Sequence, residues 1–334
     1  MTGILDSVNQ RTQMVGKNRL ELLTSFPKGL KRIPVNVDSS RFLKTVKEFR
    51  TELGRRTDHH YHSQARELYN WLTRPLEKDL GQANIDTLVF VPDGILRTIP
   101  MSALHDGDQF LIEKYAVVTT PGFTLADPKP LQREGATALL VGLSESVSGM
   151  KPLPAVEEEV RQVAEITGGK ILINSTFTPE RLSRELKRQS YGVVHMATHG
   201  LFNRDPAKTA LITHDGKITL NELENLLKFS KFREKPLELL TLSACETAAG
   251  DERAALGLAG VAAKAGARSV IASLWQVSDN ATKELMTTFY RLYFENSQVT
   301  KAKALQDAQK NLIASTKFNH PSYWAPFLII GNWL

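Results

Sequence analysis

The sequence contains a single cysteine, Cys245, among its 334 residues. An internal disulfide is therefore impossible, and a metal site built from clustered cysteines is excluded. Long apolar runs are also missing, since none approaches the roughly 18 residues that a membrane span needs. The N-terminal residues lack the basic-then-apolar layout of a secretory signal. We therefore expect a cytoplasmic protein with no membrane partner.

Concentrated charge is absent as well. The formal net charge is +6, but lysine and arginine are scattered among acidic residues instead of forming one basic tract with interleaved aromatics. We therefore expect no direct binding of nucleic acid. No segment of about 34 residues repeats along the chain, which argues against an array of helical repeats. The apolar fraction of 42% and the charged fraction of 23% are those of an ordinary globular protein.

Residues 1–82 are expected to form a short helical N-terminal segment. Apolar side chains recur at helical spacing in residues 41–53 and 65–80, and Pro75 is expected to bend or restart the second helix. Three histidines lie between these helices. We interpret them as a solvated polar turn, since a metal site needs a fixed number of ligands in a fixed geometry. They are His59, His60 and His62.

From residue 86 the pattern changes to short apolar runs that alternate with amphipathic stretches. The runs predict strands within residues 86–94, 115–122, 137–143, 170–175, 192–200, 239–250, 269–277 and 325–332. Helices are predicted within residues 154–169, 178–189, 218–229, 255–267, 280–296 and 300–315, and Thr178 before Pro179 is a good helix start. Strands alternating with helices indicate a mostly parallel sheet covered on both faces, and right-handed crossovers make it a layered α/β sandwich.

Two of the apolar stretches end in residues that carry chemistry. GVVHMATHG, at 192–200, ends on His199 and Gly200, and LLTLSACETAAG, at 239–250, contains Cys245. If the two strands are neighbours in one parallel sheet, a thiol and an imidazole emerge at the same sheet edge, where open α/β sheets bind their ligands. This is the layout of a nucleophile and its base.

Each residue of this pair would have a separate task. Cys245 reacts as a thiolate, which needs a nearby base, and His199 can be that base or can protonate a leaving amine. Gly200 has no side chain, so its N–H can approach a substrate carbonyl oxygen and share the oxyanion with the N–H of Cys245. No aspartate or asparagine is obviously placed as a third member, so the sequence supports a dyad. The alternative is that Cys245 is a small buried hydrophobic residue.

Two nearby features have plainer interpretations. His195 lies four residues before His199, on the same face of a strand. A zinc-binding histidine pair at this spacing normally sits on a helix, so we interpret His195 as a core residue or as a support behind the pair. The glycine-rich run at 257–266 lacks the Gly-Lys-Ser/Thr ending of a phosphate-binding loop, and we reject that role.

Four stretches, in this order, resemble a CHAT domain, a caspase-like family in the same peptidase clan as caspases and separase: GVVHMATHG, LLTLSACETAAG, GLAGVAAKAGARSVIASLWQVSDNAT and WAPFLIIGNW. Residues 88–125 also resemble the N-terminal half of such domains, so the resemblance covers roughly residues 60–334. It implies a caspase-like three-layer sandwich, with a supporting part at 83–135 and a catalytic part at 136–334.

By this resemblance His199 and Cys245 form the catalytic dyad of a cysteine endopeptidase, a hydrolase that cleaves protein substrates without a metal or cofactor. Family members often carry helical repeats upstream that sense a partner and switch the protease. This chain has only the short N-terminal segment, so we expect regulation by a separate protein chain. The alternative is a catalytically silent caspase-like scaffold or signalling interaction module. Presence of both residues favours the enzyme, because a scaffold has no chemical reason to keep them paired.

Substrate preference is predicted from the segment SLWQVSDNAT at 273–282. It is similar to a separase stretch that contributes an acidic residue to the pocket for the side chain before the scissile bond, and Asp279 is the matching position. Asp279 would then favour arginine or lysine through a charge-assisted hydrogen bond. The equal alternative is that it caps the helix starting near Asn280. Trp275 and Trp324 would line a groove for an extended peptide, or pack in the core.

Overall fold

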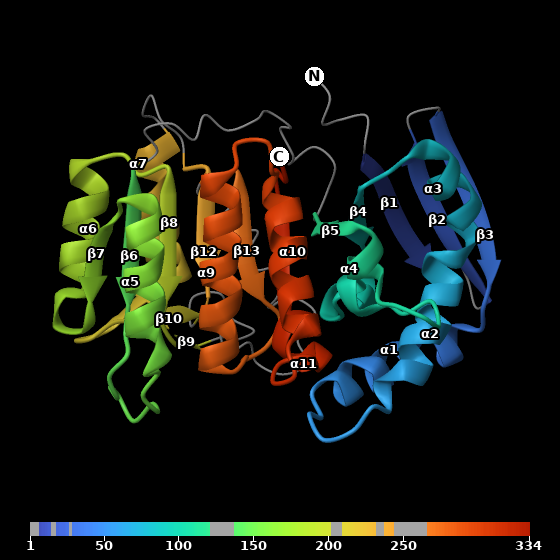
Figure 1. Cartoon of the computed structure of the whole chain (residues 1–334), viewed down its shortest axis with the longest axis horizontal. Coiled ribbons are helices and arrows are strands. Elements are labelled where there is room, and N and C mark those ends of the chain that lie inside the picture. The colour runs from blue at the N-terminus through green and yellow to red at the C-terminus, as the bar shows by residue number, and fades with distance from the viewer. Residues whose placement is uncertain are drawn as a thin grey trace.

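A large sheet of 11 strands runs through the chain (Figure 1). The structure is a computed structural model, and the residues described are 7–14, 18–26, 29–120, 137–201, 209–231, 237–243 and 266–334. From one edge of the sheet to the other, the strands are β3 (Gly29–Asn36), β2 (Arg19–Phe26), β1 (Ser7–Met14), β4 (Thr87–Pro92), β5 (Ala116–Thr119), β14 (Phe327–Gly331), β13 (Ser269–Ser273), β12 (Leu239–Leu242), β8 (Val193–Ala197), β6 (Ala138–Gly142) and β7 (Lys170–Ile173). A smaller sheet contains β11 (Lys217–Thr219), β10 (Ala210–Ile212) and β9 (Gly200–Leu201).

Most neighbouring strands of the large sheet are parallel. The pairs β8–β12, β12–β13, β6–β8 and β6–β7 are parallel, whereas β13–β14 is antiparallel. The strands β6, β8 and β13 are buried along their whole length, because both faces of a parallel sheet are covered. This burial explains why they read as continuous apolar runs, and it confirms the predicted layered α/β fold.

Helices cover both faces of this sheet. On one face, α5 (Ala155–Thr167), α9 (Asp279–Glu295) and α10 (Lys301–Ala314) lie side by side (Figure 1). The connection from β7 to β8 through α6 (Pro179–Arg188) crosses the sheet in the opposite direction to the connection through α5, so right-handed crossovers place α6 on the other face. There α6 packs against α7 (Leu220–Lys231).

Local sequence features fix where these helices start and how closely they pack. Thr178 caps α6 as predicted, and its hydroxyl accepts a hydrogen bond from the N–H of Arg181 at 3.2 Å. Gly142, at the end of β6, lies directly beneath α5. A Cβ at this position would lie 2.8 Å from Val156 Cγ1 and 2.9 Å from Val160 Cγ2, so glycine allows α5 to approach the sheet.

The prediction of a helical N-terminal segment is wrong for residues 7–14, 19–26 and 29–36, which form β1, β2 and β3. In β2 the side chains of Leu20, Leu22, Thr24 and Phe26 are all buried, the spacing of one face of a strand, and Glu21 on the other face is buried in ion pairs with Arg19 and Arg32. The strand β1 pairs in parallel with β4, and β2 and β3 continue the sheet beyond it. This segment is therefore an extension of the large sheet.

Helical structure in this region begins with α1 (Ser39–Leu53), which packs against α2 (Tyr61–Leu72). After α2 the chain makes a turn that contains Pro75 and restarts as α3 (Glu77–Ala83), which confirms the predicted interruption. Two further short helices contact α10: α4 (Leu111–Lys114) and α11 (Pro321–Trp324). Single turns of 3₁₀ helix lie at Arg74–Leu76, Gly94–Thr98, Met101–Ala103 and Asn174–Thr176.

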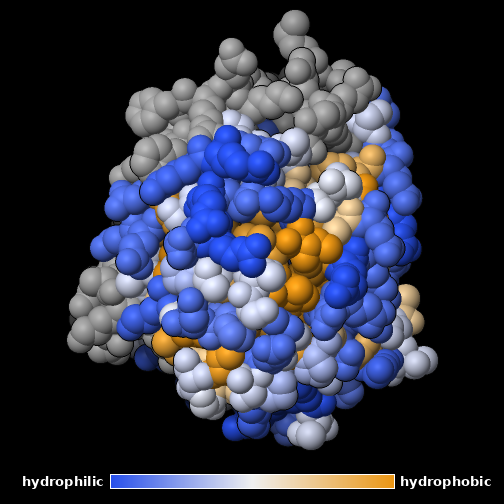
Figure 2. Space-filling model, turned by 90° about the vertical axis from the view of Figure 1, so that its left-hand side faces the viewer, coloured by the Kyte–Doolittle hydropathy of each residue, from blue (hydrophilic) through white to orange (hydrophobic). Residues whose placement is uncertain are grey.

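Figure 2 shows the face of the molecule at the β7 edge of the sheet. Most of this face is hydrophilic, with a small apolar area near its middle. On the edge strand β7 itself, Ile171 and Ile173 are half-buried. An apolar area of this kind is ordinary on a protein surface. Among the helices of the described residues, none is both long enough and apolar enough to span a membrane.

Candidate active site

The strands β8 and β12 are parallel neighbours, as the predicted pair of functional residues requires. Leu242 lies opposite Met196 in the register, and the N–H of Ser243 donates to the Met196 carbonyl at 3.0 Å. His199 follows Met196 by three residues, and Cys245 follows Leu242 by three. Cys245 itself lies outside the described residues, which end at Ser243 on this strand. The neighbour relation between the strands is thus confirmed.

His199 follows the end of β8 and is buried, with 6% of its surface exposed. Its Nε2 lies 2.8 Å from the carbonyl oxygen of Lys151. A carbonyl can only accept a hydrogen bond, so Nε2 carries the proton and, in the neutral ring, Nδ1 keeps its lone pair. Gly200, the next residue, is buried and begins β9. The ring is therefore held in the tautomer that leaves Nδ1 able to accept a proton.

The Lys151 carbonyl is a functional group that the sequence analysis missed. It orients the imidazole, a task that a buried aspartate performs in a Ser-His-Asp triad. The sequence could be searched for aspartate or asparagine, but a backbone carbonyl occurs in every residue and leaves no residue-type signal. The sequence signal that could have pointed to this carbonyl is the run KPLPA at 151–155. Its two prolines, Pro152 and Pro154, have no N–H and a restricted backbone.

Asp279 is the first residue of α9 and is half-buried. Its Oδ2 accepts a hydrogen bond from the N–H of Ala155, the first residue of α5, at 2.6 Å. The alternative prediction of Asp279 as a cap of its own helix is wrong, because the N-cap position of α9 is Ser278. Asp279 instead satisfies one of the unpaired N–H groups at the start of the neighbouring helix.

The carboxylate of Asp279 shares an electrostatic environment with His199. Burial raises the pKa of Asp279 above its ordinary value, and the charge of Glu159 adds to the rise. The hydrogen bond from Ala155 and the charges of Lys283 and His199 act in the opposite direction. Asp279 is therefore close enough to His199 for the charge of one group to affect the other.

His195 lies behind the site in the core, which confirms that interpretation. It has no exposed surface, and its Nε2 is 2.9 Å from Oε1 of the equally buried Glu159 on α5. The contact is off the hydrogen-bond axis, so we treat it as a close polar pair. The ring also meets the edge of Tyr290 on α9 at 5.4 Å between centroids, and the Tyr290 hydroxyl lies 2.8 Å from Oγ1 of Thr241 on β12.

Trp275 and Trp324 have the contacts of core residues. Trp275 is 8% exposed, and its Nε1 donates to the Ser322 carbonyl at 3.3 Å. The Arg50 guanidinium lies 4.1 Å from the Trp275 ring centroid, a cation–π arrangement, and burial lowers the pKa of Arg50 to about 10. Trp324 has no exposed surface. These contacts agree with the core-packing alternative for both rings.

The histidines at the start of α2 belong to a larger group. The rings of His59 and His62 are 6.0 Å apart, His62 and His105 are 5.0 Å apart, and His59 and His320 are 6.0 Å apart. His59 is exposed ahead of the helix, as expected of a polar turn, but the turn interpretation is wrong for His62, which is exposed within the first turn of α2. His320 is buried. The group joins α2 to α11, which are far apart in the sequence.

Across the described ranges, one set of side chains has ligand atoms spaced for a metal ion. Oxygens of Glu52 and Asp58 and a ring nitrogen of His60 all lie within 4.8 Å of one another. However, Arg55 donates from one nitrogen to both carboxylate oxygens of Glu52, at 2.9 and 3.1 Å. Because an ion pair already engages Glu52, we assign no metal ion to this set.

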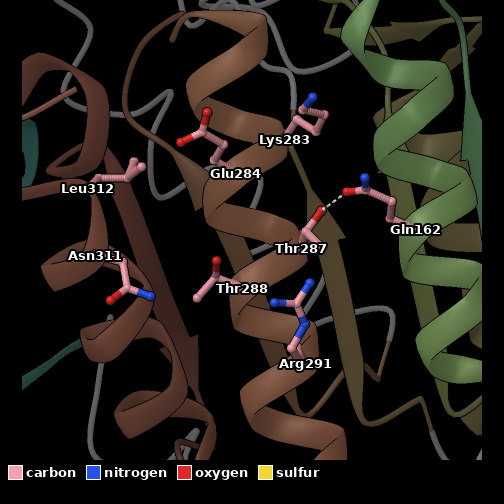
Figure 3. Close-up of a pocket in the computed structure, with 8 residues that line it drawn as sticks. All are labelled: Gln162, Lys283, Glu284, Thr287, Thr288, Arg291, Asn311 and Leu312. Atoms are coloured by element: carbon pink, nitrogen blue, oxygen red, sulfur yellow. Dashed lines mark hydrogen bonds between the residues drawn. The ribbon is translucent and has the colours of Figure 1, made fainter. Parts of the chain in front are cut away.

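A groove of about 280 Å³ lies on the helical face, among α5, α9 and α10 (Figure 3). In it, Thr287 on α9 donates from Oγ1 to Oε1 of Gln162 on α5, at 2.9 Å. The groove is lined by Gln162, Lys283, Glu284, Thr287, Thr288, Arg291, Asn311 and Leu312. None of the residues predicted to act in catalysis lines it, so we keep it apart from the candidate active site.

The family model described as the CHAT domain matches residues 62–332 of the chain. Two curated relatives are both named Tetratricopeptide repeat protein 28. The Homo sapiens protein is 25% identical over 325 residues, and the Mus musculus protein is 26% identical over 326 residues. Each match covers 80% of this chain but 13% of the relative, so the chain spans a small part of the length of these relatives.

Solved structures share the fold at low sequence identity. A chain of the Saccharomyces cerevisiae separase–securin complex matches with a TM-score of 0.60 at 11% identity, covering 98% of this chain and 30% of that chain. The Arg specific cysteine proteinase gingipain R matches with a TM-score of 0.51 at 10% identity, covering 88% and 75%. Such likenesses confirm the predicted caspase-like fold, and at these identities they show the fold alone.

Proposed function

Because the chain belongs to the CHAT domain family, we propose that it is a cysteine endopeptidase that cleaves protein substrates with His199 and Cys245. One observation carries the proposal: Nε2 of His199 donates to the Lys151 carbonyl and so leaves Nδ1 free to act as a base. The register of β8 and β12 supports it, because chains leaving adjacent parallel strands at one level emerge at the same sheet edge.

In the proposed reaction, Nδ1 of His199 takes the thiol proton of Cys245, and Sγ attacks the carbonyl carbon of the scissile peptide. The N–H groups of Gly200 and Cys245 would hold the oxyanion of the tetrahedral intermediate. The C–N bond then breaks, the amine leaves with the proton from His199, and a thioester remains. Water, losing a proton to His199, attacks the thioester, releases the acid and restores the thiol. The scheme uses no metal and no cofactor.

The Lys151 carbonyl would contribute to both halves of this reaction. In the resting enzyme it fixes the ring orientation and the tautomer. When His199 takes up the second proton, the N–H···O=C hydrogen bond becomes charge-assisted and therefore stronger. The same carbonyl would thus stabilise the imidazolium that forms as the thiolate attacks.

For the substrate, we propose arginine or lysine before the scissile bond, with Asp279 as the acidic partner. Oδ2 of Asp279 is bound to the N–H of Ala155, so Oδ1 would receive the substrate cation through a charge-assisted hydrogen bond. Gingipain R, with the same fold, is Arg specific. Trp275, 8% exposed, would contribute to the substrate groove only through its exposed edge.

For regulation, we propose a separate protein partner acting on a cytoplasmic enzyme in a signalling context. The separase neighbour was solved in a complex with securin, which supports control of this fold by a bound chain. The second candidate function is a catalytically silent scaffold. The burial of His199 favours it, because a substrate must reach the ring for catalysis.

Thiol alkylation separates the enzyme from the scaffold. The wild-type protein should react with iodoacetamide rapidly near neutral pH, and His199→Ala should slow the reaction by about tenfold or more, because the thiolate loses its base. Lys151→Ala is the matched control, since it removes the side chain and keeps the carbonyl, and its rate should stay close to wild type. Slow labelling that is the same with and without His199 would favour the scaffold.

Peptide cleavage then tests the substrate preference. Peptides that differ only in the residue before the scissile bond should be cut by the wild type when that residue is basic, and none should be cut by Cys245→Ala. Equal cleavage of basic and apolar peptides would remove the proposed role of Asp279 in specificity and leave the dyad in place.

A further inference from the structure

We propose that Asp279 is a positioning residue for His199: its carboxylate anchors the start of α5, and this anchor fixes the segment whose Lys151 carbonyl orients the imidazole. This inference rests on the proposed function and concerns the same site. It assigns Asp279 a task that is independent of any substrate side chain.

The segment from Lys151 to Ala155 has few means of staying in place. Pro152 and Pro154 have no N–H, so its hydrogen-bond donors after Lys151 are the N–H groups of Leu153 and Ala155. The side chains of Lys151, Pro152 and Pro154 are exposed and therefore add little packing. Leu153 packs partly buried against the core and Ala155 is buried, so the position of the Lys151 carbonyl depends on this packing and on those two N–H groups.

Both N–H groups have partners in the structure. Leu153 donates to the carbonyl of Ser144 at 2.9 Å, close to the end of β6. Ala155 donates to Oδ2 of Asp279 at 2.6 Å, across 124 residues of sequence. The second bond is the one with a charged acceptor, and hydrogen bonds of that kind are roughly twice as strong as neutral ones. Losing it leaves the Leu153 hydrogen bond and the packing of Leu153 and Ala155 to hold the segment.

The location of Asp279 suits this task. Pro154 occupies the N-cap position of α5 and gives no side-chain cap, so the first N–H groups of the helix need an external acceptor. A carboxylate is favoured at a helix N-terminus by the helix dipole. Because α5 and α9 pack side by side, the anchor joins two helices of one layer and transmits their rigidity to the 151–155 segment.

Electrostatics add a second contribution. The groups that act on the Asp279 carboxyl include Glu159, Lys283 and His199. The imidazolium form of His199, which is produced when the thiolate is generated, and the Asp279 carboxylate attract each other. Removing the charge should therefore shift the pH dependence of thiol reactivity, in addition to loosening the ring.

The test uses substitutions of Asp279 and a neutral alkylating reagent that offers no side chain for a specificity pocket. Asp279→Leu fills the same space without an acceptor, and Asp279→Asn keeps an acceptor oxygen for Ala155 but removes the charge. Glu284→Gln, on the exposed face of the same helix, is the matched control. Each variant is first checked for wild-type circular dichroism and a cooperative melt.

The expected result is a graded loss. The Asp279→Leu variant should be alkylated at Cys245 up to about tenfold more slowly than wild type, and the pH profile of its alkylation should be altered. Asp279→Asn should recover most of the rate but keep a shifted profile, and Glu284→Gln should match wild type. If Asp279 acted only in a substrate pocket, Asp279→Leu would change the cleavage of basic peptides and leave alkylation and its pH profile unchanged. That outcome would overturn the inference.

A second readout does not depend on the thiol. In nitrogen NMR of the histidine rings, the His199 signals are identified by their loss in His199→Ala. Wild type should show a protonated Nε2 that is hydrogen-bonded, and Asp279→Leu should shift it towards a mixture of tautomers. If the wild-type thiol proves slow and independent of His199, the proposed function fails, and the NMR comparison alone decides the positioning. If that thiol is fast and dependent on His199 but Asp279→Leu leaves the ring signals unchanged, only the inference fails.

Discussion

Replacing Glu159 tests whether the buried polar pair beneath β8 stabilises the strand that leads to His199. Glu159 has no exposed surface, and its Oε1 lies 2.9 Å from Nε2 of the equally buried His195. Removing one member of a buried pair leaves the other without compensation and typically costs about 3–5 kcal/mol. Because the contact is off the hydrogen-bond axis, we expect Glu159→Ala to lie near the lower end, at about 3 kcal/mol. Glu159→Gln keeps a polar group and should cost about 1–2 kcal/mol.

The measurement is urea unfolding followed by tryptophan fluorescence, with the free energy taken from the midpoint and slope. Glu158→Gln is the matched control, since Glu158 is the adjacent residue on α5 but is exposed and pairs with Lys283 at 2.8 Å. An exposed pair of this kind contributes about 0–1 kcal/mol. Converting both buried partners to apolar residues, Glu159→Leu with His195→Phe, should recover much of the loss. The reasoning is refuted if Glu159→Ala costs no more than Glu158→Gln.

Acidification should destabilise the protein through the histidines that join α2 and α11. Burial lowers the pKa of His320 and partial desolvation by neighbouring groups lowers the pKa of His105 and His62 from the ordinary 6.5, with the charges of the other histidines adding to the fall at His62, so the unfolded chain binds more protons in mild acid. Stability should therefore be fully present above about pH 6.5 and fall as the pH drops towards the lowered values, by at most about 1.4 kcal/mol per pH unit from the buried His320. Urea midpoints measured from neutral to mildly acidic pH check this, and His320→Gln should flatten the dependence, whereas a flat wild-type profile would contradict it. Separately, Arg50→Met should cost about 1–2 kcal/mol through the lost cation–π contact with Trp275, and an unchanged urea midpoint would show that this contact contributes nothing.

The part of the fold that could be predicted is the part where burial on both faces leaves a local signal. The strands β8 and β12 lie inside the sheet, and every position in each is buried. They therefore appear in the sequence as continuous apolar runs, and their polar ends mark the sheet edge. The parallel pairing of these two strands was a hypothesis suggested by that pattern, and their register confirms it.

The N-terminal strands could not be predicted in the same way. The strand β3 is mostly exposed and lies at the edge of the sheet, so it has no apolar run. The strand β1 finds its partner, β4, about 80 residues further along, as in the pair Val8 and Leu88. The strand β2 has a local signal, apolar residues at Leu20, Leu22 and Phe26, and a window set for helical spacing passes over it.

The contacts around His199 show what sequence reasoning can and cannot supply. In the run KPLPA at 151–155, Pro152 and Pro154 leave only two N–H groups after Lys151, those of Leu153 and Ala155, so donor counting predicts that acceptors for them must come from outside the segment. One acceptor is nearby in sequence, the carbonyl of Ser144, and it belongs to the strand end that precedes the segment. The other, Asp279, is 124 residues away from its donor, and no local pattern links the two. The type of residue is nevertheless the one to expect. Because Pro154 gives α5 no side-chain cap, a carboxylate from elsewhere in the chain is favoured at this helix N-terminus by the helix dipole.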